Sequence, residues 1–248
     1  MGLNDTSLGG DGRSFPSTRW SRILGTPDLG AIFRAYWKPV YASIRIGWRK
    51  SNEDAKDQTQ AFFTHLTEKN GLAGIQPEGG RFRSYLKQAL RNFMIDADRA
   101  AAVRKPVQAA FSIESDPDAL ERWGPAAPGE SPERVFDREW LACLLDTAVS
   151  KLEQELESRG KGVTFQVFRT YLLDPAPSDA TTIQTQGGQV AVPTYAEVAA
   201  RFKIKETDVR NYLNHCRPRL REILQEEIRA TVDSDRDVEE ELQSLLRG

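Results

Sequence analysis

The chain has 248 residues, which is room for one large domain or two modest ones. Hydrophobic residues make up 39% of it and charged residues 28%, a balance that excludes a wholly disordered protein. The net charge of -2 excludes a uniformly basic surface but permits separate basic and acidic faces.

Membrane insertion, secretion and metal binding find no support in the sequence. No run approaches the roughly 18 apolar residues of a membrane span. Residues 1–14 are polar and rich in glycine, so we expect a disordered start and no signal peptide. Cys143 and Cys216 lie far apart, which favours a reduced, cytoplasmic chain. With His65 and His215 they show no zinc spacing, and we expect no metal and no cofactor.

Apolar residues recur at helical spacing through three stretches of the N-terminal half. These stretches cover residues 27–49, 54–67 and 82–104. Pro39 predicts a break or kink in the first of them. We expect the three to close a small helical domain over residues 15–105.

Residues 106–131 are rich in Pro, Ser and acidic side chains, and their composition predicts a flexible linker. Helical patterns resume at 132–158 and 162–173. A polar loop follows, in which we expect a short hairpin at Gly187 and Gly188.

The second helical domain is expected over residues 132–228, followed by an acidic, helical tail over 229–248. The sequence therefore predicts an all-α fold with two helical domains joined by a flexible linker.

A sharp helical corner is predicted near residue 204. Thr194 and Glu197 have the spacing of a capping box, which opens a short helix. Ile204 would plug the turn, and Val209 and Leu213 would anchor a second helix. The opposite face of this second helix carries polar and basic side chains, namely Arg210, Asn211, Asn214, His215 and Arg217.

Arg and Asn make paired hydrogen bonds to guanine and adenine edges in a major groove. A corner with such a second helix has the layout of a DNA-binding helix-turn-helix. Residues 194–224 also hold seven basic side chains against four acidic ones, the local surplus that phosphate contacts need. The alternative is an ordinary helical hairpin with a solvated basic face.

A second basic element covers residues 81–105, with seven basic side chains against two acidic ones. The aromatic residues Phe82, Tyr85 and Phe93 are interleaved with the charges, and their spacing assigns them to the core. The charges form a face that could hold a nucleic-acid backbone.

Four stretches together resemble the sigma-70 family of bacterial RNA polymerase sigma factors. "TRWSRILG", "YWKPVYASIR" and "FRSYLKQALRNFMIDADR" are similar to region two, and "TYAEVAARFKIKETDVRNYLNHCRPRLREIL" is similar to the region-four helix-turn-helix. The resemblance covers about residues 15–105 and 132–228. The short, two-domain format is that of the extracytoplasmic-function (ECF) group.

The resemblance implies that region two melts the minus-ten element and captures a flipped base. Asn92 and Asp96 fall at its base-contacting positions, Arg81 lies in the loop that holds the base, and Arg99 belongs to the same basic helix. Region four would read the minus-thirty-five element through the exposed face of the second corner helix. Lys205 stands where relatives often have a capping Ser, so we expect that helix start to fray or the turn to differ.

The helix over 54–66 resembles the segment that docks on the polymerase beta-prime clamp. Asp54, Asp57, Gln60 and Phe63 match its pattern. Two positions that are commonly acidic hold Lys56 and Ala61 instead, so the surface is poor in acid.

Phosphorylation could restore this missing charge, because a phosphate carries nearly two negative charges. Thr59 is the leading candidate, with Thr64 and Ser51 also available. The chain also resembles a subgroup of the family whose members are paired with Ser/Thr kinases. The alternative is that these hydroxyls simply occupy a helix surface.

The predicted function is a non-enzymatic promoter-specificity subunit that directs transcription initiation. Its implied partners are the polymerase core, through the beta-prime clamp and beta flap, and promoter DNA. A Ser/Thr kinase or an anti-sigma factor would regulate it. The alternative is a helix-turn-helix transcriptional regulator that never engages polymerase. Metal-dependent cleavage by Glu114, Asp116 and Asp118 is disfavoured, because these acids lie in the linker without a supporting scaffold.

Overall fold

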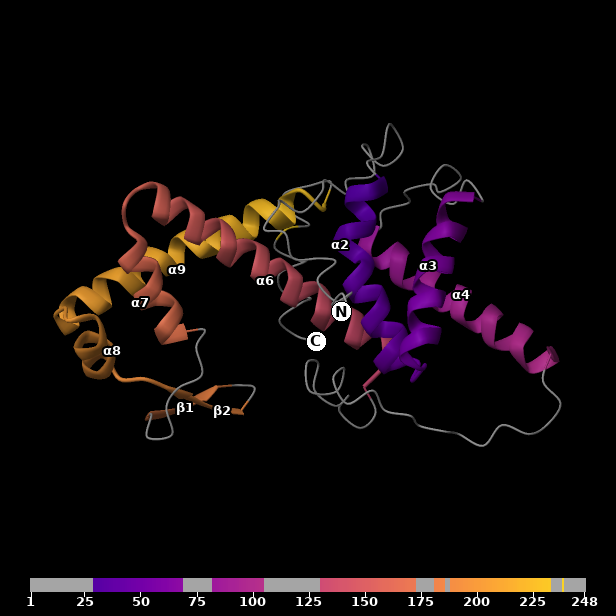
Figure 1. Ribbon diagram of the computed structural model, residues 1–248, viewed down its shortest axis with the longest axis horizontal. Coiled ribbons are helices and arrows are strands. Elements are labelled where there is room, and N and C mark those ends of the chain that lie inside the picture. Colours follow the sequence, from indigo (N-terminus) through magenta and orange to yellow (C-terminus); the bar gives the residue numbers. More distant parts are fainter. Residues whose placement is uncertain are drawn as a thin grey trace, which may run out of the picture. The chain divides into compact units, whose positions relative to one another are not determined.

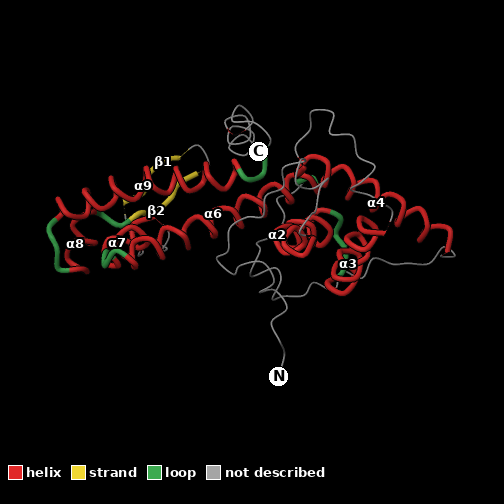
Figure 2. Tube along the Cα trace, turned by 90° about the horizontal axis from the view of Figure 1, so that it is seen from above, coloured by secondary structure: helices red, strands yellow, loops and turns green. Residues whose placement is uncertain are grey.

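The computed structural model describes residues 29–68, 82–104, 130–172, 181–185, 188–232 and 238. Over these residues the chain forms seven α-helices, one π-helical turn and a two-stranded antiparallel hairpin (Figures 1 and 2). The predicted helical class is confirmed. The expectations for the N-terminus, for nearly all of the linker and for most of the acidic tail lie outside the described residues.

The chain divides into two compact units. Unit 1 comprises Met1–Leu145 with Glu227–Gly248, and unit 2 comprises Asp146–Glu226. The division falls inside a long helix, whereas the sequence-based division was drawn at the linker over residues 106–131.

Unit 1 contains α2 (Leu29–Ala42), the π-helical turn η2 (Ser43–Gly47), α3 (Asn52–Glu68) and α4 (Phe82–Arg104). The predicted third helix matches α4 at both ends, and α3 extends the predicted second helix by a residue or two at each end. The predicted break lies later than expected, because α2 passes through Pro39 and gives way to η2 at Ser43.

Aromatic rings from three helices form the centre of unit 1. Tyr36 of α2 packs edge-on against Phe82 of α4, with ring centroids 5.5 Å apart. Tyr36 also stacks on Phe136 of α6 at 6.3 Å. All three rings are at most 1% exposed. Their burial ties α4 and the start of α6 to the same core.

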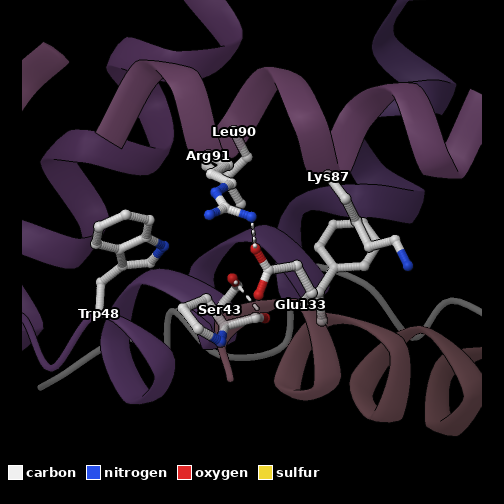
Figure 3. A pocket seen from close by; sticks show the side chains of 8 residues that line it. Ser43, Trp48, Lys87, Leu90, Arg91 and Glu133 are labelled. Carbon is white, nitrogen blue, oxygen red and sulfur yellow. Dashed lines mark hydrogen bonds and ion pairs between the residues drawn. The ribbon is translucent and has the colours of Figure 1, made fainter. Parts of the chain in front are cut away.

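Helix α6 (Pro132–Ser158) begins as part of unit 1. The Ser43 hydroxyl donates a hydrogen bond to the Pro132 carbonyl at 2.9 Å, and Arg91 of α4 faces Glu133 at 3.6 Å (Figure 3). Gly47 lies so close to Pro132 that a Cβ on it would sit 2.4 Å from the Pro132 Cα. The first turns of α6 are therefore packed against η2 and α4.

Unit 2 contains the rest of α6, α7 (Gly162–Leu172), α8 (Tyr195–Phe202) and α9, which begins at Glu206 and ends at Arg229 just beyond the unit boundary. The predicted limits of α6 are confirmed, and α7 ends one residue earlier than predicted. Each helix contributes an apolar face to one core. Its fully buried members include Leu152, Phe168, Val198, Val209 and Leu213.

Between α7 and α8 the chain forms the predicted hairpin. Strand β1 (Thr181–Thr185) pairs antiparallel with β2 (Gly188–Val192), and Thr185 faces Gly188 at the closed end. Of the two glycines at which the hairpin was predicted, Gly188 begins β2 and Gly187 lies outside the described residues. Elsewhere, no described helix is long and apolar enough to cross a membrane.

Candidate nucleic-acid interface

Helix α8 begins with the predicted capping box. The Glu197 backbone N–H donates to the Thr194 hydroxyl at 3.2 Å, and the Thr194 N–H donates to the Glu197 carboxylate at 2.5 Å. The hydrogen bond from the Thr194 backbone lowers the pKa of Glu197. The entry to the corner is therefore fixed by local hydrogen bonds as well as by packing.

The turn after α8 reverses the chain through a left-handed residue. Lys203 has φ 55° and ψ 43°, and its N–H donates to the Ala200 carbonyl at 3.3 Å. The Ile204 N–H donates to the Ala199 carbonyl at 3.0 Å. These two bonds define a Schellman motif, which satisfies the last carbonyls of a helix. Ile204 packs against the unit 2 core, as the sequence predicted.

Helix α9 starts directly after Lys205, and the expected fraying is not seen. The Asp208 carboxylate accepts from the Lys205 backbone N–H at 3.1 Å. In a capping box, the side chain of the third helical residue accepts from the backbone N–H of the N-cap residue, and Asp208 makes this bond to Lys205. The prediction considered only the Lys205 side chain and so missed this compensation.

The two faces of α9 differ sharply in the part that belongs to unit 2. Val209, Leu213 and Cys216 are completely buried. The five side chains predicted to contact DNA are all exposed: Arg210, Asn211, Asn214, His215 and Arg217. The face that the sequence marked out is therefore available to a partner.

Arg219 and Arg217 of α9 have different surroundings. Arg219 donates to Glu155 of α6 at 2.8 Å and to Glu222 at 2.9 Å, and these bonds raise its pKa. Arg217 lies over the Tyr171 ring, 6.0 Å from its centroid, while remaining exposed. Arg219 thus links α6 to α9, and Arg217 remains accessible to a ligand.

Two cations of the predicted basic face of α4 are paired within unit 1, which corrects the sequence analysis for these two. Arg83 and Lys87 both pair with Asp137 of α6, the latter at 2.7 Å. Arg83 is only 4% exposed and lies over the Trp140 ring at 5.0 Å. The sequence could not indicate this pairing, because Asp137 is about fifty positions away.

A different face of α4 borders an open groove of about 510 Å³ beside α3. Asn92 and Asp96 lie in its lining and are exposed. The Gln88 amide donates to the Asn92 side-chain oxygen at 3.0 Å, and Arg99 faces Asp96 at 3.5 Å. The groove is completed by His65, Leu66, Tyr85, Ala89, Phe93 and Ala97.

Tyr85 and Phe93 are half-buried, so they serve this groove as well as the core to which they were assigned. Phe93 contacts His65 of α3, with ring centroids 5.7 Å apart. Sequence reasoning overlooked His65 and Gln88. Helical spacing places Gln88, Asn92 and Asp96 on one face, but nothing local shows that α3 lies beside that face. Arg81 falls outside the described residues.

On α3, Asp54, Asp57 and Gln60 are exposed, as a docking surface requires. Phe63 is 3% exposed and stacks on Trp37, with ring centroids 5.8 Å apart. The prediction that Phe63 touches a partner is therefore wrong, and its role is to hold α3 against α2.

The three candidate phosphorylation sites differ in access. Thr59 is fully buried, and its hydroxyl donates to the Ala55 carbonyl at 2.6 Å, so a kinase cannot reach it in the folded chain. Thr64 is exposed, with its hydroxyl 3.0 Å from the Gln60 carbonyl. Ser51 accepts from the Asp54 N–H at 3.1 Å and so caps α3. The choice of Thr59 as leading candidate is wrong, because it lies on the inward face of α3.

No group of His, Cys, Asp and Glu side chains that could hold a metal occurs in the described residues. Cys143 and Cys216 are both buried and form no disulfide. No family model, no curated protein and no solved structure matches the chain.

Proposed function

We propose that this chain is an RNA polymerase sigma factor of the ECF type, which directs promoter recognition and transcription initiation. The observation that carries the proposal is the exposed Arg/Asn face of α9, presented by a capped helix-turn-helix corner. Arg210 and Asn214 lie one turn apart on it, so both can reach neighbouring base edges in a major groove. In this proposal unit 2 reads the minus-thirty-five element.

Unit 1 would then contact the minus-ten element. Its groove combines half-buried rings with the exposed polar groups of Asn92 and Asp96. Extruding a base from a duplex costs a few kcal/mol, and stacking in a preformed groove offsets part of that cost. The Asn92 amide can both donate to and accept from a base edge, whereas ionised Asp96 only accepts.

The exposed face of α3 would dock on the polymerase clamp. Asp54 and Asp57 supply negative charge, while Lys56 and Ala61 leave the surface poorer in acid than the family pattern. Each missing rim charge weakens such a contact by about 0.2–1 kcal/mol. Thr64 is the exposed threonine nearest this surface, four residues after Gln60, and a phosphate there would add nearly two negative charges.

Run-off transcription tests the proposal. Purified core polymerase should produce discrete transcripts from genomic fragments only when the chain is added. Asn214→Ala should reduce these transcripts, whereas Gln154→Ala, an exposed polar residue on α6, should not. The competing regulator would instead protect specific DNA by itself and leave core polymerase unable to open it.

Core binding tests the role of Thr64 separately. Phosphorylated wild type should bind core more tightly than the unmodified chain, and Thr64→Ala should lose that gain. Because Thr59 is buried, Thr59→Val should retain the gain. If phosphorylation still tightens core binding by Thr64→Ala, Thr64 is not the regulatory site.

A further inference from the structure

Lys203 adopts a backbone conformation that L-amino acids disfavour. Among the described non-glycine residues, only Lys203 and Arg49 have positive φ. At the end of α6 in the same unit, the left-handed position is occupied by glycine. Gly160 has φ 69°, and the Lys161 N–H donates to the Leu156 carbonyl at 2.8 Å. Glycine at 203 would close the same hydrogen bonds with less strain.

The Lys203 side chain makes no contact that offsets this strain. It is exposed, and no carboxylate in the described part of the chain pairs with it. Strained residues that persist without a structural gain are candidates for function. A lysine at this position therefore points to a ligand outside the chain.

The surroundings of Lys203 indicate which chemistry that ligand has. Arg201 and Lys205 flank it at alternate positions and are exposed, and Arg210 follows one turn into α9. The Arg201 guanidinium lies over the Phe202 ring, 5.8 Å from its centroid, which keeps it near the turn. Arg201, Lys203 and Lys205 thus place exposed positive charge on the stretch that leads into α9, whose exposed face begins at Arg210.

We propose that Lys203 contacts a phosphate of duplex DNA at the edge of the groove that α9 enters. The inference rests on the proposed DNA-binding function and assigns Lys203 to positioning, because a phosphate contact carries no sequence information. Its long side chain allows the ammonium group to extend beyond the turn and pair with a backbone oxygen.

The experiment measures binding of the full chain to a short mixed-sequence DNA duplex over a range of salt concentrations, alongside thermal unfolding. Lys203→Gly should weaken binding about fivefold at low salt and reduce the slope of log K against log salt by about 1. The same variant should unfold about 2 °C higher, because the backbone strain is relieved. Lys203→Arg should keep the wild-type salt slope.

Lys161→Ala is the matched control, since it removes an exposed cation of unit 2 outside the corner. It should leave affinity and salt slope unchanged. If wild type binds duplex DNA and Lys203→Gly binds with the same affinity and slope, the assignment of Lys203 is overturned while the proposed function stands. If wild type fails to bind duplex DNA even at low salt, the assignment of Lys203 is overturned, while run-off transcription with core polymerase still decides the proposed function.

Discussion

Replacing Gly47 by Ala tests whether the start of α6 is packed against η2. The new methyl carbon would lie 2.4 Å from the Pro132 Cα and 2.8 Å from its Cβ. Both atoms belong to a proline at the start of a helix, so the neighbour cannot rotate away. Pro132 must move by about 1 Å to restore van der Waals contact, at which distance atoms attract instead of overlapping.

This movement has two costs and one gain. Overpacking costs about 1–3 kcal/mol, and loss of the Ser43 to Pro132 hydrogen bond costs about 1 kcal/mol. Alanine gains back about 1 kcal/mol over glycine through its helix propensity. Gly47→Ala should therefore lower the free energy of unfolding of unit 1 by about 1–3 kcal/mol.

Urea unfolding followed by tryptophan fluorescence measures this change, since Trp48 and Trp140 both lie in unit 1. Gly162→Ala is the control, because a Cβ there meets nothing within 4 Å. Because Gly162 lies in unit 2, this variant should leave the unfolding of unit 1 that tryptophan fluorescence reports unchanged. Equal stability of the two variants would refute the close packing of Pro132 against η2.

Three further predictions concern unit 2. Leu213 is completely buried, so Leu213→Ala should lower the free energy of unfolding in urea by about 2–5 kcal/mol, and DNA binding should be lost as unit 2 unfolds. A decrease below about 1 kcal/mol would contradict the place of Leu213 in the core. Because the pKa of Glu197 is lowered, its ionised carboxylate stabilises the folded chain at neutral pH, and this stabilisation is lost as pH falls through the folded-state pKa. Glu197→Gln should therefore have a lower melting temperature than wild type at neutral pH and the same melting temperature in acid. A difference in melting temperature that persists in acid would show that the effect does not come from the charge on Glu197. Burial raises the pKa of Cys216 to about 11, so its thiol should react with iodoacetamide much more slowly than in urea-unfolded chain, and equal rates would contradict that burial.

Helix positions in this chain could be predicted from sequence because their signals are local. The capping box at Thr194 and Glu197 depends on residues three apart, and the buried stripe through Val209 and Leu213 depends on helical spacing. The limits of α4 and α6 followed from the same periodicity. The exposed face of α9 could be predicted because it is the complement of that stripe.

The errors arose where distant parts of the chain meet. Arg83 and Lys87 of α4 looked free because their partner, Asp137, is about fifty positions further along the chain. Thr59 looked available because its neighbours in sequence are polar, whereas the packing of α3 turns it inward. Only tertiary contacts reveal the pairing with Asp137, whereas the helical spacing of Thr59 with Phe62 and Phe63 already indicated its burial.

The most direct test of the central claim is run-off transcription by core polymerase, with and without the chain. The account predicts discrete promoter-dependent transcripts with the wild-type chain and far fewer with Asn214→Ala. Core polymerase that gains no promoter selectivity from the folded chain, in phosphorylated and unmodified form alike, would contradict it.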